Sequence, residues 1–270
     1  LAFLWNFDKA PQIYKNWKDG LKSAIEEIGK NHSVDVYLGE ECRRIDEEYD
    51  CILLWTDSND PIITDTQNLV GKKGIILTTD PHNIDNLKRL DVVFCESTPV
   101  YEAVRSHGIR AVKAFGTDCD FYSPNDEIIK DIPYFYPATF SPWKRQSEIA
   151  HLGRELYLVG TVQPDGKDEL EACRRAGCNI EIGYSKPEYI RDLYRRAQKV
   201  IIPAIHGSER TVLEAMATNL LPIVKNPQNR RTRSYLLEYV QSGDKTPRDF
   251  VVKSYNHIKY AKDILRGFGY

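Results

Sequence analysis

The segment from His206 to Thr211 is polar, lies between two apolar runs, and has the residue types of a loop that opens a helix. Ser208 is a favoured N-cap residue, and apolar residues at helical spacing follow it. The backbone N–H groups from Ser208 to Thr211 would then point outward at the positive end of the helix dipole. Such a helix end binds anions, so the segment predicts a diphosphate site.

Glu214 lies about one turn inside the expected helix, which Asn219 and Pro222 end. A carboxylate at that position can accept two hydrogen bonds from a vicinal diol such as a ribose. The same pattern is also typical of an ordinary capped helix with one exposed glutamate. The residues alone leave both interpretations open.

The elements that position these residues follow from short apolar runs that alternate with amphipathic stretches, a pattern typical of parallel sheets covered by helices. In the first half, one long helix is expected, with its apolar face running from Ile13 through Trp17 to Ile28. A second helix over 98–107 ends at Gly108. Strands are expected at 2–5, 34–38, 51–55, 74–78, 92–95 and 111–114.

The second half repeats this α/β architecture. Strands are expected at 134–137, 156–160, 179–183, 200–203 and 222–225, and a helix at 167–176. Ser185 to Glu188 has the spacing of a capping box, with Pro187 inside the first turn of the next helix. The last stretch, 251–270, is expected to be one helix.

Composition limits the class of protein. With 270 residues, 41% of them hydrophobic, and no apolar run near eighteen residues, the chain suits one large or two modest domains without a membrane span. The stretch from Leu1 to Trp5 is too short for a secretory signal. The six cysteines have neither CxxC pairs nor zinc spacing, so we expect reduced thiols and a cytoplasmic location.

The net charge of −2 conceals an asymmetry between the two halves. Residues 1–130 carry 15 basic and 23 acidic side chains, whereas residues 131–270 carry 22 basic and 16 acidic ones. A basic second half suits a domain that holds a diphosphate, although solvated helix faces produce similar imbalances. An acidic first half argues against docking of that half on a nucleic-acid backbone.

The run Glu214-Ala215-Met216-Ala217, followed by Leu221-Pro222-Ile223-Val224, resembles the carboxy-terminal signature of the family 4 glycosyltransferases and their relatives in the GT-B superfamily. That signature has two glutamates separated by seven residues, the first near the transferred sugar and the second on the ribose. Glu214 matches the second, and His206 stands at the position of the first. A neutral imidazole can donate to a sugar hydroxyl but brings no negative charge, and Glu209 could replace the glutamate only in a different loop conformation.

A second match is the loop 116–126, which resembles the segment before the interdomain linker in the same enzymes. The resemblance implies a GT-B fold, in which two Rossmann-like domains face each other across a cleft and a C-terminal helix crosses back to the first domain. We expect an N-terminal acceptor-side domain of residues 1–125, together with the terminal helix of about 254–270. Residues 126–253 would form the nucleotide-sugar-binding domain.

The resemblance also implies site residues. In the family an Arg and a Lys five or six residues apart hold the diphosphate; Lys144 fits the Lys, but Ala138 or Thr139 stands at the place of the Arg. Arg145 or Arg210 could compensate, because a guanidinium can hold two phosphate oxygens. The remaining donor-binding candidates are Gly183 and Tyr184 near the base, and Gly207, Ser208, Glu209, Thr211 and Glu214 on the diphosphate and ribose.

Further candidates lie in the first domain. His82, with Asp80 as an alternate, follows an expected strand and would contact the donor sugar as His206 does. Asn6, Asp8 and Lys9, together with the segment from Trp55 to Ser58, would line the same crevice and meet the acceptor. A loop histidine is often simply solvated, and neither set of residues identifies the acceptor.

No metal site is expected. Asp118-Cys119-Asp120 has the spelling of the DxD motif of metal-dependent enzymes but sits in the linker-side loop, so cationic side chains and the helix dipole would stabilise the leaving group. No cofactor is expected beyond the nucleoside diphosphate sugar, which serves as donor substrate. The chain has no P-loop, GxSxG elbow or Gly-rich dinucleotide fingerprint.

These features favour an enzyme that moves a hexose from a UDP or GDP sugar to an unidentified acceptor, with retention of configuration, as a monomer or weak homodimer. The acceptor would be a glycan, a lipid-linked sugar or a small molecule. Two alternatives stay open. The chain could be a catalytically silent sugar-nucleotide binder, or, because of the basic run 230–233, a glycosyltransferase acting on modified DNA. That run is also typical of a solvated loop.

Overall fold

The computed structural model describes residues 1–270 apart from 9, 17 and 78, so Lys9, Trp17 and Thr78 of the sequence predictions lie outside the described residues. The chain divides into two units. The first contains Leu1–Gly116 and Asn256–Tyr270, and the second contains Thr117–Tyr255. Within the described part of the chain, no helix combines the length and the apolar character that a membrane crossing requires.

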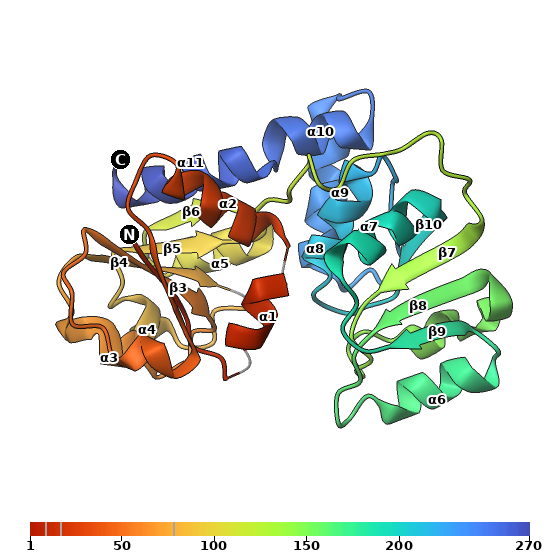
Figure 1. The fold of residues 1–270 in the computed structure, drawn as a ribbon, viewed down its shortest axis with the longest axis horizontal. Helices are drawn as coiled ribbons and strands as arrows, with labels where there is room; N and C mark the ends of the chain where they lie inside the picture. The colour runs from red at the N-terminus through yellow and green to blue at the C-terminus, as the bar shows by residue number, and fades with distance from the viewer. Residues whose placement is uncertain (9, 17, 78) are drawn as a thin grey trace. The chain divides into compact units, whose positions relative to one another are not determined.

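The first unit is built on a six-stranded parallel sheet with strand order β2-β1-β3-β4-β5-β6 (Figure 1). The strands are β1 (Ala2–Trp5), β2 (Asp35–Leu38), β3 (Cys51–Thr56), β4 (Lys72–Leu77), β5 (Val92–Cys95) and β6 (Ala111–Lys113). The apolar runs of β1, β3, β4 and β5 are buried on both faces of the sheet, as parallel strands covered by helices require, whereas the edge strands β2 and β6 are mostly half-buried. The predicted strands are confirmed to within two residues at each described end.

Helices cover both faces of this sheet. The described helices are α1 (Ala10–Asn16), α2 (Gly20–Gly29), α3 (Ile62–Asp65), α4 (Ile84–Leu87), α5 (Thr98–Ser106) and α11 (His257–Phe268), with the 3-10 helices η1 (Gly39–Arg43) and η2 (Thr66–Asn68). Helices α2 and α11 pack side by side on one face (Figure 1). The ring of Phe268 lies 5.4 Å from that of Phe94 on β5, so the last helix completes the core of the first unit.

Two helices were predicted as longer than they are. The helix expected from Ile13 to Ile28 is divided into α1 and α2, because the Asp19 carboxylate accepts from the N–H of Lys22 and starts a new helix. The helix expected over 251–270 is likewise divided, because the Asn256 side chain caps α11 at the N–H of Lys259. In both cases a side-chain cap outweighs the continuous apolar periodicity.

The second unit has a five-stranded parallel sheet with strand order β11-β10-β7-β8-β9. Its strands are β7 (Ile132–Pro137), β8 (Leu156–Gly160), β9 (Asn179–Ile182), β10 (Ala197–Ile202) and β11 (Ile223–Val224). Its helices are η3 (Gln146–Glu155), α6 (Lys167–Arg175), α7 (Pro187–Arg196), α8 (Glu209–Ala217), α9 (Arg230–Ser242) and α10 (Pro247–Ser254). The predicted capping box before α7 is wrong, since Lys186 is the N-cap residue and makes no side-chain cap.

The loop 116–126 joins the second unit from Thr117 onward. The guanidinium of Arg248 donates to the carbonyl oxygens of Cys119, Tyr122 and Ala217, which fixes this loop to the end of α8. The Asp118 carboxylate accepts from the backbone N–H groups of Asp120 and Phe121. Asp118 therefore shapes a turn in this loop.

Candidate donor-binding site

The loop between β10 and α8 lies at the carboxyl end of a parallel strand, where open α/β sheets bind ligands. Its backbone is held by the start of α9. The Asn229 amide donates to the carbonyl oxygens of Ala204 and Gly207, both at 3.1 Å, and the Thr232 hydroxyl donates to Gly207 at 2.6 Å. Gly207 and Ser208 both have positive φ, 73° and 75°. The loop therefore has one fixed conformation ahead of the helix.

Ser208 occupies the N-cap position of α8, but its side chain does not cap the helix. Its hydroxyl oxygen lies 2.9 Å from the Tyr136 hydroxyl and accepts from the ammonium of Lys144 at 3.0 Å. The expected side-chain cap is thus wrong, because the left-handed backbone turns the hydroxyl away from the first turn. The Ser208 oxygen positions Lys144 beside the helix N-terminus instead.

Lys144 is half-buried against this loop. The φ of 73° at Gly207 favours glycine, and a Cβ atom there would lie 2.8 Å from the Lys144 nitrogen, so a side chain at position 207 would displace the ammonium. Burial lowers the pKa of Lys144 to about 8; the Glu209 carboxylate opposes this shift, and the nearby guanidinium groups of Arg210 and Arg231 add to it. A bound anion would reverse the shift, since it favours the charged ammonium.

Glu209 and Arg231 form a buried ion pair, with 2.5 Å between Oε1 and Nε. They are only 6% and 9% exposed. The interpretation of 230–233 as a solvated loop is therefore wrong for Arg231, which lies in the first turn of α9. The signal for that helix was present in the sequence as Asn229, which caps it by accepting from the N–H of Thr232. Arg231 thus engages the Glu209 carboxylate.

Glu214 is 4% exposed, which contradicts the alternative of an exposed glutamate on an ordinary helix. Its Oε2 accepts from the hydroxyl of Tyr194 at 3.0 Å, and its Oε1 lies 3.4 Å from Nε of Arg210. Burial, followed by the charge of Glu214, raises the pKa of Tyr194, so the phenol stays a donor. The carboxylate is thereby held in one orientation.

His206 is exposed and stacks on Trp143, with ring centroids 5.9 Å apart and planes 11° apart. The carbonyl of Trp143 accepts from the N–H of Ile205 at 2.9 Å, which joins the two loops. Sequence reasoning gave Trp143 no role, and nothing in its local pattern indicates this stacking partner. The imidazole lies at the start of the loop that ends at Ser208.

The other donor-side candidates take separate positions. Gly183 has φ 129° and directly follows β9, and Tyr184 is exposed beside it. Arg145 has φ 51° and pairs with Glu148 at 2.5 Å on the surface, one residue beyond Lys144. The Thr211 hydroxyl lies 3.4 Å from the carbonyl of Pro137. Two guanidinium groups were predicted to compensate for the missing arginine. Arg145 pairs with Glu148, and Arg210 lies on α8 beside Glu214.

In the first unit, the loop after β4 carries the exposed His82. The backbone N–H groups of His82 and Asn83 donate to the buried hydroxyl of Ser58 at 3.1 and 3.0 Å. The Asn86 side chain donates to the carbonyl of Ser58 at 3.0 Å. Ser58 thus fixes the backbone that presents the imidazole at the carboxyl ends of β3 and β4.

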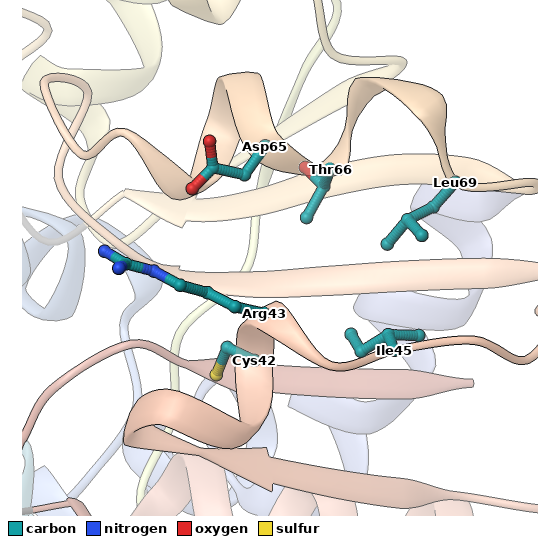
Figure 2. Close-up of a pocket in the computed structure, with 6 residues that line it drawn as sticks. All are labelled: Cys42, Arg43, Ile45, Asp65, Thr66 and Leu69. Atoms are coloured by element: carbon teal, nitrogen blue, oxygen red, sulfur yellow. The ribbon is translucent and has the colours of Figure 1, made fainter.

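A hollow of about 210 Å³ lies in the first unit, between η1 and the α3–η2 segment (Figure 2). Arg43 and Asp65 are its charged side chains, and Ile45 and Leu69 are apolar ones. Cys42 and Thr66 complete the lining. None of the predicted site residues lines it, so this hollow is separate from the donor-binding candidates.

No protein-family model and no curated protein matches the chain significantly. Among solved structures, it is similar to AviGT4, a glycosyltransferase involved in avilamycin A biosynthesis, at 15% identity and a TM-score of 0.65 over 99% of this chain and 96% of that one. It is also similar to an alpha-glucosyltransferase in complex with UDP and a 13-mer DNA containing an HMU base, at 9% identity and a TM-score of 0.59 over 100% and 99%.

A third similar structure is the UDP-GlcNAc 2-epimerase from Neisseria meningitidis bound to UDP-GlcNAc, at 10% identity and a TM-score of 0.53 over 99% of both chains. Coverage of nearly the whole chain in all three comparisons, with two parallel sheets of six and five strands, shows the GT-B fold. At these identities the comparisons establish the fold alone.

Proposed function

We propose that this GT-B chain is a glycosyltransferase that moves a hexose from a nucleoside diphosphate sugar to an acceptor hydroxyl. The observation that carries the proposal is the Lys144 ammonium held by Ser208 at the N-terminus of α8. A fixed cation next to the positive end of a helix dipole stabilises the charge that develops on a departing diphosphate. Glu214 would accept from the ribose hydroxyls, and Gly183 and Tyr184 would lie against the base.

The charges around this helix end suit metal-independent transfer. Lys144, Arg210 and Arg231 contribute three positive charges, against the two carboxylates of Glu209 and Glu214. Arg231 neutralises Glu209, which would otherwise place a negative charge at the anion-binding end of the helix. Arg210, whose side chain is 53% exposed at the start of α8, is the proposed substitute for the absent family arginine, because Arg231 is buried against Glu209. Arg145, which pairs with Glu148, is a less suitable substitute.

His206 would donate to a hydroxyl of the transferred sugar. The role of His82, in the first unit, stays a prediction from the resemblance. Stacking on Trp143 restricts the orientation of the His206 ring, which favours a directed hydrogen bond. Retention of configuration is proposed from the resemblance of the Glu214 segment to the retaining family 4 enzymes. The uncharged imidazole at the position of the first glutamate makes the sugar-binding step the one in which this chain differs from that family.

UDP is the proposed nucleotide, because two of the similar structures contain UDP or a UDP sugar. A thermal-shift screen with UDP, GDP and ADP tests this, since a ligand that binds only the folded state raises the melting temperature. A shift of the melting temperature by UDP alone supports the proposal. The absence of a shift with every nucleoside diphosphate contradicts it.

A catalytically silent binder is the second candidate, favoured by His206 and by the missing arginine near Ala138. The two candidates differ in donor hydrolysis without acceptor, since slow release of a sugar requires a working leaving-group site. Because a similar structure is an epimerase, the assay should also identify the sugar that is released or that stays on the nucleotide, so that hydrolysis is distinguished from epimerisation. An unchanged donor after prolonged incubation, together with UDP binding, favours the silent binder.

A glycosyltransferase acting on modified DNA is a further candidate, since one similar structure holds such a DNA. The burial of Arg231 weakens it, because the basic run 230–233 presents fewer charges than its sequence suggests. The excess of acidic residues in 1–130 also disfavours a phosphate backbone. A gel shift at low salt tests it, and the absence of DNA binding there removes this acceptor.

A further inference from the structure

Three aromatic side chains meet at the carboxyl ends of β1 and β3 in the first unit. The ring centroids of Trp5 and Trp55 lie 4.5 Å apart, and those of Trp5 and Phe7 lie 6.0 Å apart with planes at 22°. Trp5 and Trp55 are half-buried, whereas Phe7 is 44% exposed. An exposed ring stacked on a half-buried ring is an unusual use of apolar surface, and we name this group the aromatic platform.

The platform is fixed by the sheet and by the loop that follows it. The parallel pairing of Leu4 with Leu54 places Trp5 and Trp55 next to each other on the same face. The N–H of Phe7 donates to the carbonyl of Trp5 at 2.9 Å, and the carbonyl of Phe7 accepts from Ala10 at 2.8 Å. The exposed ring is therefore attached to a backbone that is hydrogen-bonded on both sides.

Polar residues neighbour the platform along the chain. The Asn6 amide donates to Oδ1 of Asp60 at 3.1 Å, and the hydroxyl of Thr56 donates to the other oxygen of that carboxylate. Asp8 is exposed next to Phe7, and Asp57 follows β3. Carboxylates and an amide at the edge of an aromatic surface suit hydroxyl groups, which can donate to them, and repel phosphates.

We infer that the aromatic platform binds a pyranose ring of a carbohydrate acceptor; this inference rests on the proposed glycosyltransferase function. A pyranose has one face of C–H groups, which packs on an aromatic ring, and hydroxyl groups at its edge, which reach the neighbouring carboxylates and amide. A lipid chain would need a deeper apolar groove. A nucleic acid would bring phosphates toward Asp8 and Asp57. The carboxyl end of the sheet is where this fold class binds its ligands.

Saturation-transfer NMR tests the platform on the 270-residue chain. The probes are methyl α-D-glucopyranoside, methyl β-D-galactopyranoside, methyl α-D-mannopyranoside, maltose, n-octyl β-D-glucoside and a single-stranded oligothymidine. We expect at least one sugar to receive saturation at its ring C–H protons. Phe7→Ala should weaken that sugar's binding by about three- to tenfold. Ile129→Ala, at a side chain that is 81% exposed in the second unit, is the matched control and should leave binding unchanged.

The inference is overturned if no sugar receives saturation, or if Phe7→Ala and Ile129→Ala give the same signal. Saturation confined to the octyl chain, or to the bases of the oligothymidine, would also overturn it by assigning the platform to another occupant. UDP binding, followed by thermal shift in the same samples, separates this result from the proposed function. If UDP still binds but no sugar receives saturation, only the inference about the aromatic platform is contradicted. If a sugar receives saturation but UDP does not bind, only the assignment of the donor site is contradicted.

Discussion

At the scale of single residues, each charged side chain among the donor-binding candidates has a defined contact partner. Lys144 is held by Ser208, Glu209 by Arg231, and Glu214 by Tyr194 and Arg210. Each of these contacts leads to a measurable expectation, because removal of one partner leaves the other buried without compensation.

UDP affinity should depend on pH through Lys144. Its pKa is lowered to about 8 in the free protein, so the ammonium is lost as the pH rises through that value. A diphosphate favours the charged form, and the affinity is expected to fall by up to about tenfold per pH unit above 8. Calorimetric titration between pH 7.5 and 9.5 measures the slope. Lys144→Arg stays charged in this range and should show no slope; an equal slope in both proteins would contradict the assignment.

Glu214→Ala is expected to weaken UDP binding by about 1–3 kcal/mol, because the ribose loses its hydrogen-bond acceptor. Titration with 2′-deoxy-UDP sharpens the test through a double-mutant cycle. The deoxy analogue should bind less tightly to the unmodified protein and equally to the variant. Glu171→Ala, on an exposed ion pair with Arg174, is the control and should bind both nucleotides normally. If 2′-deoxy-UDP binds less tightly than UDP by the same factor in all three proteins, Glu214 does not bind the ribose.

Arg231→Met should lower the free energy of unfolding by about 3–5 kcal/mol, because Glu209 is left buried and unpaired. Glu209→Gln in the same chain removes that charge and is expected to restore most of the loss. Urea denaturation monitored by circular dichroism measures both changes. Arg174→Ala, at the surface pair, should change stability by less than about 0.5 kcal/mol. If the double variant is as unstable as Arg231→Met, the ion pair is not the cause.

At the scale of elements, helix ends determine where the charged residues lie. Helix α8 ends at Ala217 with Thr218 as its C-cap residue, and the exposed Asn219 takes φ 64° directly after that cap. A β-branched residue is strained in that conformation, so Asn219→Val should lower the free energy of unfolding by about 1–2 kcal/mol. Asn219→Gly has no such strain and should be at least as stable as the unmodified protein. Equal melting temperatures for the two variants would show that the helix end tolerates side-chain strain.

The same scale shows what the sequence could predict. Buried parallel strands produce continuous apolar runs, so β5 and β8 were predicted to the residue, and Asn219 correctly ended α8. Caps formed by Asp19 and Asn256 were missed because the apolar spacing continues across them. The left-handed backbone of Ser208 and the burial of Arg231 depend on α9 and β7, which are distant in sequence. Local patterns carry no information about such partners.

At the scale of the whole molecule, the two units have separate cores and should respond separately to damage. Phe268→Ala removes a buried ring from the first unit, which should lose about 3–5 kcal/mol of stability. UDP is proposed to bind the second unit, so calorimetry should show two transitions, with UDP raising only the upper one. A single transition that UDP raises as a whole would contradict this independence.

The position of α11 has a consequence for synthesis on the ribosome. The first unit is made of two segments, and the second unit is inserted between them, between Gly116 and Asn256. The residues that fill the space beside Phe94, including Phe268, are thus translated after the whole second unit. The inserted unit is complete, and able to fold, before the unit that begins the chain has its final helix. The order of maturation is the reverse of the order of the sequence, and a chain released early by the ribosome would contain the nucleotide-binding candidates without a finished first unit.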